Sequence, residues 1–125
     1  ALYHTMISPS IFADVDGKYR GADSKIHKAV PGFTPYTIFS LWDTYRAVQP
    51  LNTLIDGKVA DYVNSLLDIY DCQGTLPVWH LAGNETSCMV GVHSIPIIVD
   101  ACLKKHSRYR QGACIQGCSE YRTDE

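Results

Sequence analysis

The clearest hydrophobic pattern in the chain lies between Asp56-Gly57 and Gly74. Apolar side chains recur there at the i, i+4, i+7, i+8 and i+11 spacing of one helix face. They are Val59, Val63, Leu66, Leu67 and Tyr70. The wetter side of the same segment is formed by Lys58, Asp61, Asn64 and Asp68. The pattern predicts an amphipathic helix that buries one face and ends at Asp71 to Gly74.

A second apolar segment follows, from Thr86 or Ser87 to Lys105. Its apolar residues cover nearly the whole circumference of a helix, which predicts a helix enclosed on most sides. Pro96 predicts a bend near its middle, and Lys104-Lys105 suit the negative end of the helix dipole.

Shorter elements are predicted in the first half of the chain. Tyr3 to Ile7 is helix-like and stops before Pro9. Alternating apolar residues from Phe12 to Gly21 surround Asp16-Gly17, which predicts a small β-hairpin. Tyr36 to Phe39 is aromatic and β-branched, which is typical of an extended segment.

Leu41 to Leu54 predicts a further helix that Pro50 either kinks or divides, because proline removes a backbone hydrogen bond. With the two helices above, these elements indicate a mainly α fold with a small β-hairpin near the N-terminus.

Two stretches share one order of residue types, an aromatic residue followed by polar and acidic residues. Phe39 to Arg46 contains Trp42-Asp43, and Leu76 to Thr86 contains Trp79. Each precedes a predicted helix, and the inner helices of a helical toroid begin at the same rim, so the two stretches are expected to share one cavity. Aromatic faces pack on C–H groups while carboxylates accept from hydroxyls, so such a cavity suits a neutral polyol.

A plainer interpretation stays open for each of these residues. Ser and Asp are favoured at helix starts because they satisfy unpaired backbone N–H groups, so Ser40 and Asp43 also suit a helix cap. Trp79 suits packing, and structural roles are expected for His4, His80 and His93.

Composition narrows the partners of the chain. The 125 residues are 46% hydrophobic and 19% charged, as in a globular domain, with a formal net charge of -2. A chain without a basic surface is not expected to bind nucleic acid or an anionic membrane. It contains no uninterrupted apolar run of about 18 residues, so no membrane-spanning helix is expected. The start at Ala1 carries no basic segment of a signal peptide and is typical of the last turns of a helix.

The periodicity ends near His106. The chain holds five cysteines, an odd number, and Cys114 and Cys118 with His106 form only a weak metal signal without a standard zinc spacing. Residues 107–125 are therefore predicted to form an irregular tail, behind a domain made of residues 1–106.

Four runs of residues then stand in one order: Tyr3-His4-Thr5-Met6 to Pro9-Ser10, Asp14 to Gly21, Tyr36 to Arg46, and Leu81-Ala82-Gly83-Asn84-Glu85-Thr86. Together they resemble the catalytic domain of the glycoside hydrolase family 92 exo-α-mannosidases. The resemblance runs from Ala1 to about Lys105. Members have several hundred residues, so the chain is expected to be about the first third of such a catalytic domain, without the β-sandwich before it and most of the toroid after it.

The resemblance implies a fold, an activity and a cofactor. The fold is an (α/α)6 toroid behind a β-sandwich domain, and the activity is removal of terminal α-linked mannose from glycans with inversion. Calcium is implied to hold two adjacent mannose hydroxyls. The family's general acid lies in a Glu-Gly-Asn motif and its base in a Gly-Asp-x-Asp motif, neither of which occurs here. Neither catalytic residues nor calcium ligands are therefore expected in this chain, and the implied location is bacterial, periplasmic or secreted.

The resemblance also implies a substrate-binding role for part of this chain. Asp43 is expected to accept from hydroxyls of the terminal mannose, while Trp42 and Arg46 orient Asp43 or line the pocket. Asn84 and Glu85 are further candidates, with Glu85 either contacting sugar or capping the next helix.

Two functions of different classes follow. The first is a glycosidase fragment that contributes part of a mannose-binding subsite and works with the rest of its own catalytic domain. The alternative is a non-catalytic helical binding or interaction module derived from such a domain. Because the segment from Cys88 to Leu103 is so apolar, an independent module would need a partner to cover it.

Overall fold

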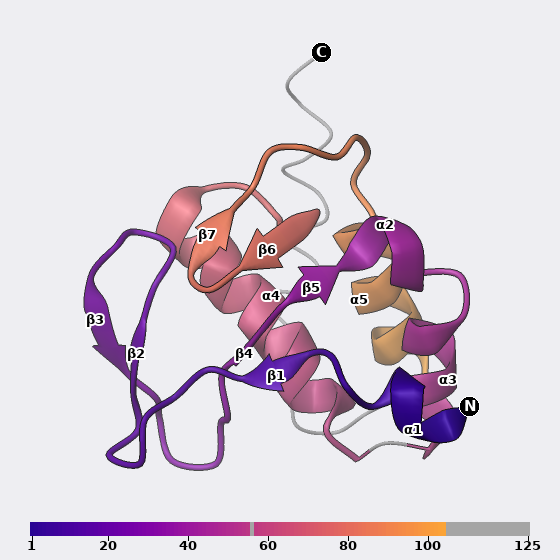
Figure 1. The fold of residues 1–125 in the computed structure, drawn as a ribbon, viewed down its shortest axis with the longest axis horizontal. Helices are drawn as coiled ribbons and strands as arrows, with labels where there is room; N and C mark the ends of the chain where they lie inside the picture. The colour runs from indigo at the N-terminus through magenta and orange to yellow at the C-terminus, as the bar shows by residue number, and fades with distance from the viewer. Residues whose placement is uncertain (56, 105–125) are drawn as a thin grey trace.

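The computed structural model describes residues 1–55 and 57–104, where helices and short strands are arranged around one core (Figure 1). The helices are α1 (Leu2–Thr5), α2 (Leu41–Thr44), α3 (Val48–Ile55), α4 (Val59–Gln73) and α5 (Ser94–Leu103). The strands are β1 (Ser10–Ile11), β2 (Lys18–Arg20), β3 (Ile26–Lys28), β4 (Tyr36–Thr37), β5 (Phe39–Ser40), β6 (Trp79–Leu81) and β7 (Asn84–Glu85).

Helix α4 lies at the centre of the core, and its amphipathic pattern is confirmed. Val63, Leu66 and Leu67 on its apolar face are at most 1% exposed, and they pack with residues of β5 and α5. Gly74 follows the helix with a φ of 81° and donates its N–H to the carbonyl of Tyr70 at 2.7 Å. This left-handed cap ends the helix where the sequence predicts.

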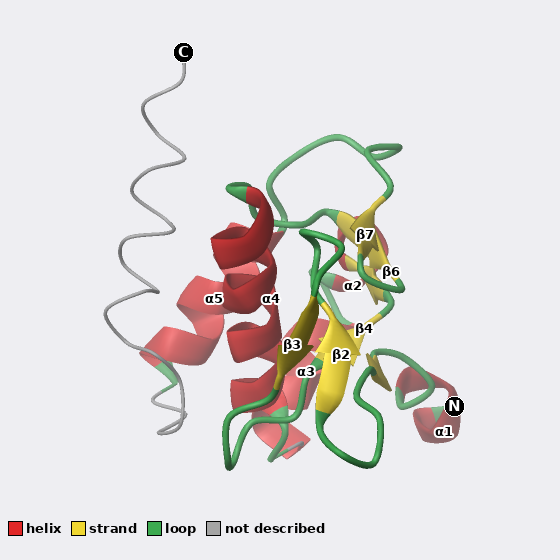
Figure 2. Cartoon of the chain, turned by 90° about the vertical axis from the view of Figure 1, so that its left-hand side faces the viewer, coloured by secondary structure: helices red, strands yellow, loops and turns green. Residues whose placement is uncertain are grey.

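Helix α5 packs against α3 and α4 but is shorter than predicted (Figure 2). It begins at Ser94 because Ser87 and Gly91, with φ of 52° and 98°, interrupt right-handed helix before it. Within the described residues, the helix is enclosed only in part. Ile98 and Ala101 are buried, whereas Val99 is 40% exposed and Leu103 is 76% exposed.

Two prolines mark helix beginnings instead of bends. Pro50 and Pro96 each occupy the third position of their helix, α3 and α5. The N–H groups of a first turn have no partner within the helix, so proline is tolerated there. The helix predicted from Leu41 to Leu54 is indeed divided, but at residues 45–47 rather than at Pro50.

The single hairpin expected near the N-terminus is replaced by three small antiparallel sheets. β1 pairs with β4, β2 with β3, and β5, β6 and β7 form the third sheet. Tyr36 to Phe39 is extended as predicted, with a break at Ile38, whose φ is 66°. This break lets β4 pair with β1 while β5 turns to pair with β6.

The hairpin predicted about Asp16-Gly17 is not formed, because the two segments on either side of this turn pair with other strands. A turn does form there, since Gly17 has a φ of 78° and the N–H of Asp14 donates to the carbonyl of Lys18 at 2.8 Å. The segment before the turn is engaged elsewhere, because Ser10 pairs with Thr37 in β4. Strand β2 therefore pairs forward with β3, through the turn at residues 21–25.

Some predictions fall outside the described residues. They concern the irregular tail at 107–125 and the possible metal ligands His106, Cys114 and Cys118. Within the described ranges, none of the helices has the length and apolar character needed to cross a membrane. The helix predicted before Pro9 is confirmed as α1.

Candidate functional site

The first candidate stretch forms the end of β5 and the start of α2. Leu41 is fully buried, and its backbone N–H donates to the carbonyl of Val78 at 3.0 Å. With Leu41 anchored in the core, the next two residues lie at the surface. Trp42 is 43% exposed, and Asp43 is exposed.

Asp43 has a hydroxyl partner and remains open to solvent. Ser40 occupies the N-cap position of α2, but its hydroxyl donates to Asp43 Oδ2 instead of accepting from a backbone N–H. The hydroxyl of Thr44 donates to the Ser40 carbonyl at 2.9 Å. The side-chain cap proposed for Ser40 is therefore not formed, and the exposed carboxylate of Asp43 retains oxygen lone pairs that a ligand hydroxyl can reach.

Arg46 contacts Tyr45 rather than Asp43. Its Nε donates to the Tyr45 hydroxyl at 2.6 Å, and its guanidinium carbon lies 4.9 Å from the centre of the Tyr45 ring. The Tyr45 ring lies 4.5 Å from the ring of His93, between centroids. Arg46 and His93 thus hold Tyr45 at the edge of α2 from two sides.

The second candidate stretch lies directly beside the first, through a sheet. β6 pairs with β5, which places Trp79 opposite Ser40 and His80 opposite Phe39. The predicted proximity is therefore found, but the predicted form is wrong. Residues 79–85 are a β-hairpin instead of the mouth of a second helix, since Ala82 and Gly83 both have positive φ and form its two-residue turn.

Glu85 holds this hairpin and the loop that follows it. Its carboxylate accepts from the backbone N–H groups of Val78 at 2.9 Å, Trp79 at 3.2 Å and Ser87 at 3.1 Å. It caps no helix, because the next helix begins only at Ser94. Asn84, beside it in β7, is exposed.

His80 lies on the inner side of the hairpin and is 2% exposed. Its Nδ1 lies 3.4 Å from the hydroxyl oxygen of Thr37, which also accepts from the N–H of Ala82 at 2.9 Å. Burial lowers the pKa of His80, because an imidazolium loses its hydration in the core. Its role is to join β6 to β4 from within, which agrees with the structural role predicted for it.

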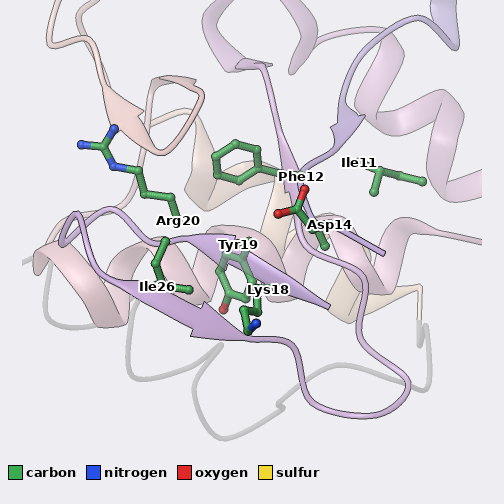
Figure 3. Close-up of a pocket in the computed structure, with 8 residues that line it drawn as sticks. Ile11, Phe12, Asp14, Lys18, Tyr19, Arg20 and Ile26 are labelled. Atoms are coloured by element: carbon green, nitrogen blue, oxygen red, sulfur yellow. The ribbon is translucent and has the colours of Figure 1, made fainter. Parts of the chain in front are cut away.

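Hollows on the described surface are lined by other residues. A groove of about 530 Å3 lies between the segment at residues 11–14 and β2, and its lining includes Phe12, Asp14, Lys18, Tyr19 and Arg20 (Figure 3). A second hollow of about 440 Å3 lies between β3, the loop after it and α4. Neither of these two hollows includes the five candidate residues; Trp42, Asp43, Arg46 and Asn84 are exposed, and Glu85 is partly buried.

A comparison with protein families identifies the family of this chain. Residues 1–121 match the model described as the glycosyl hydrolase family 92 catalytic domain. The chain belongs to glycoside hydrolase family 92. A comparison with curated proteins found no match.

Solved structures of family 92 proteins resemble this chain closely. The α-mannosidase BT3965 of Bacteroides thetaiotaomicron matches 98% of the chain with 40% identity and a TM-score of 0.92. Its complex with mannoimidazole matches 92% with 42% identity and a TM-score of 0.87. The inverting mannosidase BT2199 of the same species matches 93% with 28% identity and a TM-score of 0.80. The chain spans 17%, 15% and 16% of these structures.

The described part of this chain contains no side-chain cluster that fits the calcium ion implied by family 92. Calcium prefers six to eight oxygen ligands, of which carboxylates are the strongest. The group of side chains that converge closely enough to hold a metal is Asp23, His27 and Cys72, whose nitrogen and sulfur suit a softer ion. The location of the calcium ligands stays a prediction.

Sequence reasoning missed that group of three. Asp23 and His27 flank the β2–β3 turn at a spacing of four residues, which is a weak local signal. Cys72 lies 45 residues further on and joins them only because the hairpin packs on α4. No local pattern reveals such a contact.

Proposed function

We propose that this chain is part of an exo-α-mannosidase that hydrolyses terminal α-linked mannose from glycans with inversion, and that it supplies part of the mannose-binding subsite. The observation that carries the proposal is the meeting of α2 with the β6–β7 hairpin in a family 92 domain. The similar structures are named as mannosidases, and one of them holds mannoimidazole.

The surface where α2 meets the hairpin suits a neutral sugar. Trp42 offers an exposed aromatic face for the C–H side of a pyranose ring. Asp43 accepts from vicinal hydroxyls, and Asn84, which is exposed next to the hairpin turn, can donate or accept. Arg46 supports this edge through Tyr45, and Glu85 holds the backbone of the hairpin in place. In this proposal, Glu85 is a positioning residue, because its oxygens already accept from three backbone N–H groups.

The chemistry of the reaction falls to residues outside this chain. Inversion requires a general acid on the leaving oxygen and a base that activates water on the opposite face, with carboxylates about 6.5 to 9.5 Å apart. We assign both carboxylates, and the ligands of the calcium ion, to the rest of the catalytic domain. Calcium supplies a fixed positive charge for two hydroxyls of the mannose when it is bound. The residues described here bind and orient the sugar.

The proposal places the chain in an (α/α)6 toroid. Apolar side chains on α3 and α5 remain exposed, with Leu54 at 75%, Ile55 at 51% and Leu103 at 76%. Further helices of the domain would cover this face, which makes the rest of the domain the partner of this chain. The proposed location is bacterial, periplasmic or secreted.

The experiment is an assay of the full-length protein on a terminal α-mannoside with calcium present. Proton NMR of early time points reports the anomer of the released sugar, and inversion releases β-mannose first. Release of α-mannose first would refute the inverting mechanism. Binding of mannosides without any turnover would favour the non-catalytic module instead.

A further inference from the structure

The last turn of α4 and the β2–β3 hairpin meet at three side chains with different donor atoms. His27 Nε2 lies 2.9 Å from Asp23 Oδ1 and 4.0 Å from Cys72 Sγ. The three donor atoms all lie within 4.8 Å of one another. Figure 2 shows the hairpin against α4, where this contact is made. We call this group the Asp-His-Cys cluster.

The spacing of these atoms fits a tetrahedral metal ion. Zinc binds imidazole nitrogen and carboxylate oxygen at about 2.0–2.2 Å and thiolate sulfur at about 2.3 Å. Tetrahedral angles then place neighbouring donors roughly 3.3–3.7 Å apart. The observed separations of 2.9 and 4.0 Å lie on either side of this range, and the third, between Asp23 and Cys72, is at most 4.8 Å, so side-chain shifts of up to about an ångström bring the donors to these distances.

The cluster is held from its surroundings before any ion binds. Asp23 Oδ1 also accepts from the backbone N–H of Lys25 at 3.0 Å, which fixes the carboxylate in the hairpin turn. Such support of a ligand by a neighbouring donor is typical of metal sites. Asp23 is 21% exposed and His27 is 34% exposed, so an ion can enter from solvent.

Gly21 leaves the space in which the ligands converge. A Cβ atom at Gly21 would lie 2.7 Å from His27 Nε2 and 2.8 Å from Asp23 Oδ1, closer than real Cβ contacts allow. Gly21 does not have a positive φ, so the turn itself does not demand glycine there. The missing side chain therefore serves the approach of His27 and Asp23.

The electrostatic setting favours a cation. The carboxylates of Asp68 and Asp23 place negative charge near the Cys72 thiol. Asp68 is held nearby by the hydroxyl of Tyr19 at 2.9 Å. The charge of a divalent ion offsets these neighbouring carboxylates.

We propose that Asp23, His27 and Cys72 bind Zn2+, with water in the fourth position, and that the ion fastens the β2–β3 hairpin to the end of α4. Mixed nitrogen, oxygen and sulfur donors suit zinc, and three protein ligands leave one tetrahedral position open. This site is separate from α2 and from the proposed calcium ion, and it does not depend on the proposed glycosidase activity.

The test is titration of the metal-stripped, reduced full-length protein with Co2+, which replaces zinc and is coloured. A thiolate-to-cobalt band in the near ultraviolet and strong tetrahedral bands in the visible are expected to saturate at a single equivalent, and Zn2+ should abolish them. An oxygen-only calcium site produces no thiolate band. Absence of the band in the folded wild-type protein would overturn the proposal.

Variants assign the band to the cluster. Cys72→Ala is expected to abolish it although Cys114 and Cys118 remain, while His27→Gln and Gly21→Ala should weaken Co2+ binding at least tenfold. Cys88→Ala and His4→Gln are matched controls at exposed positions and should bind as the wild type does. Far-ultraviolet circular dichroism checks that each variant is folded. A band that survives Cys72→Ala would refute the site and leave a His27–Asp23 ion pair with a nearby thiol.

Discussion

Asp43 in α2 and Glu85 in β7 are carboxylates whose surroundings give them different tasks. Glu85 accepts from three backbone N–H groups, so its charge is used within the fold. Asp43 accepts from one neighbouring hydroxyl and faces solvent. A carboxylate whose oxygens are already engaged holds structure, whereas an exposed one at a family motif is available to a ligand.

The first prediction concerns Asp43→Asn in the full-length protein. Asn keeps a polar group at the start of α2 but removes the charged acceptor for sugar hydroxyls. The rate of hydrolysis of an α-mannoside should fall tenfold or more, which corresponds to a rise of at least about 1.4 kcal/mol in activation free energy. The Tm should change little. Normal kinetics with a lower Tm would instead show that Asp43 only stabilises the helix.

The second prediction concerns the pH dependence that His80 adds to stability. Burial lowers the pKa of His80 below its ordinary value of 6.5, so the unfolded chain takes up the proton first as the pH falls. The free energy of unfolding should therefore decrease as the pH drops below about 6.5, and level off below the pKa of the folded state. Thermal melts between neutral and mildly acidic pH measure this slope.

A variant isolates the contribution of His80 from those of other groups. His80→Gln should lower stability overall but flatten the slope of Tm against pH, while His4→Gln at the exposed N-terminus should keep it. Asp16 and Asp23, whose pKa values are lowered by their hydrogen bonds to Lys18 and His27, titrate below 3.8 and so act outside this window. An unchanged slope in His80→Gln would show that the imidazole is not protected by burial.

At the scale of single elements, the sequence predicts those whose pattern is local and strong. α4 has its apolar face, its polar side and its terminal Gly74 within one continuous segment. Each of these signals acts between neighbours, so the helix and its buried face follow from the sequence. The candidate residues Trp42 and Asp43 were likewise placed correctly at the start of a helix.

Elements that depend on distant pairing could not be derived in this way. The segment from Ser10 pairs with Tyr36-Thr37, and β6 pairs with β5 some forty residues before it. The turn at Ala82-Gly83 has only a weak local signal, because both residues adopt a positive φ although only glycine favours it. The kink or division predicted at Pro50 and the bend predicted at Pro96 assume helices that begin earlier than α3 and α5 do.

The third prediction tests the hairpin turn with two glycine variants. Gly83 and Gly32 have φ of 79° and 86°, so alanine at either costs about 1–2 kcal/mol of stability for backbone strain. A Cβ at Gly83 would also lie 2.9 Å from the Arg20 carbonyl oxygen, whereas nothing lies within 4 Å at Gly32. Gly83→Ala should therefore lower the free energy of unfolding by roughly 1–3 kcal/mol more than Gly32→Ala.

Denaturant unfolding of both variants measures the difference, and activity adds a second readout. The clash would move the hairpin away from β2, and with it Asn84 beside the proposed sugar site. Mannoside hydrolysis should then fall in Gly83→Ala and stay normal in Gly32→Ala. Equal losses of stability in both variants would contradict the close contact between Gly83 and Arg20.

At the scale of the whole molecule, the proposed site is open and incomplete. The chain spans about a sixth of the family 92 structures that it matches. Trp42, Asp43 and Asn84 are exposed in the described part of the chain and line neither of the two hollows above. A pocket that encloses mannose therefore requires walls from the rest of the domain, which is also where we assign the catalytic carboxylates and the calcium ligands.

The fourth prediction is that the full-length protein needs calcium. Removal of metal with a chelator should abolish mannoside hydrolysis while circular dichroism shows the protein still folded. Calcium added back should restore activity. Zinc alone should not, because zinc prefers four ligands with nitrogen and sulfur donors, whereas a calcium site offers six to eight oxygens. Turnover at the normal rate by a metal-free preparation would refute the calcium requirement.

The last prediction is that the 125 residues expressed alone have no mannosidase activity and do not form a clean monomer. Inverting hydrolysis needs two positioned carboxylates, and the proposed acid and base lie outside this chain. On α3 and α5, Leu54, Ile55, Val99 and Leu103 are all at least 40% exposed. Soluble monomers rarely expose a contiguous apolar patch larger than roughly a few hundred Å2, so these side chains favour association. Light scattering after size exclusion should therefore show association, with the full-length protein as control. A monomeric peak with a cooperative melt would contradict the uncovered face, and measurable turnover would place an acid and a base among residues such as Asp14, Asp16, Asp43 and Glu85.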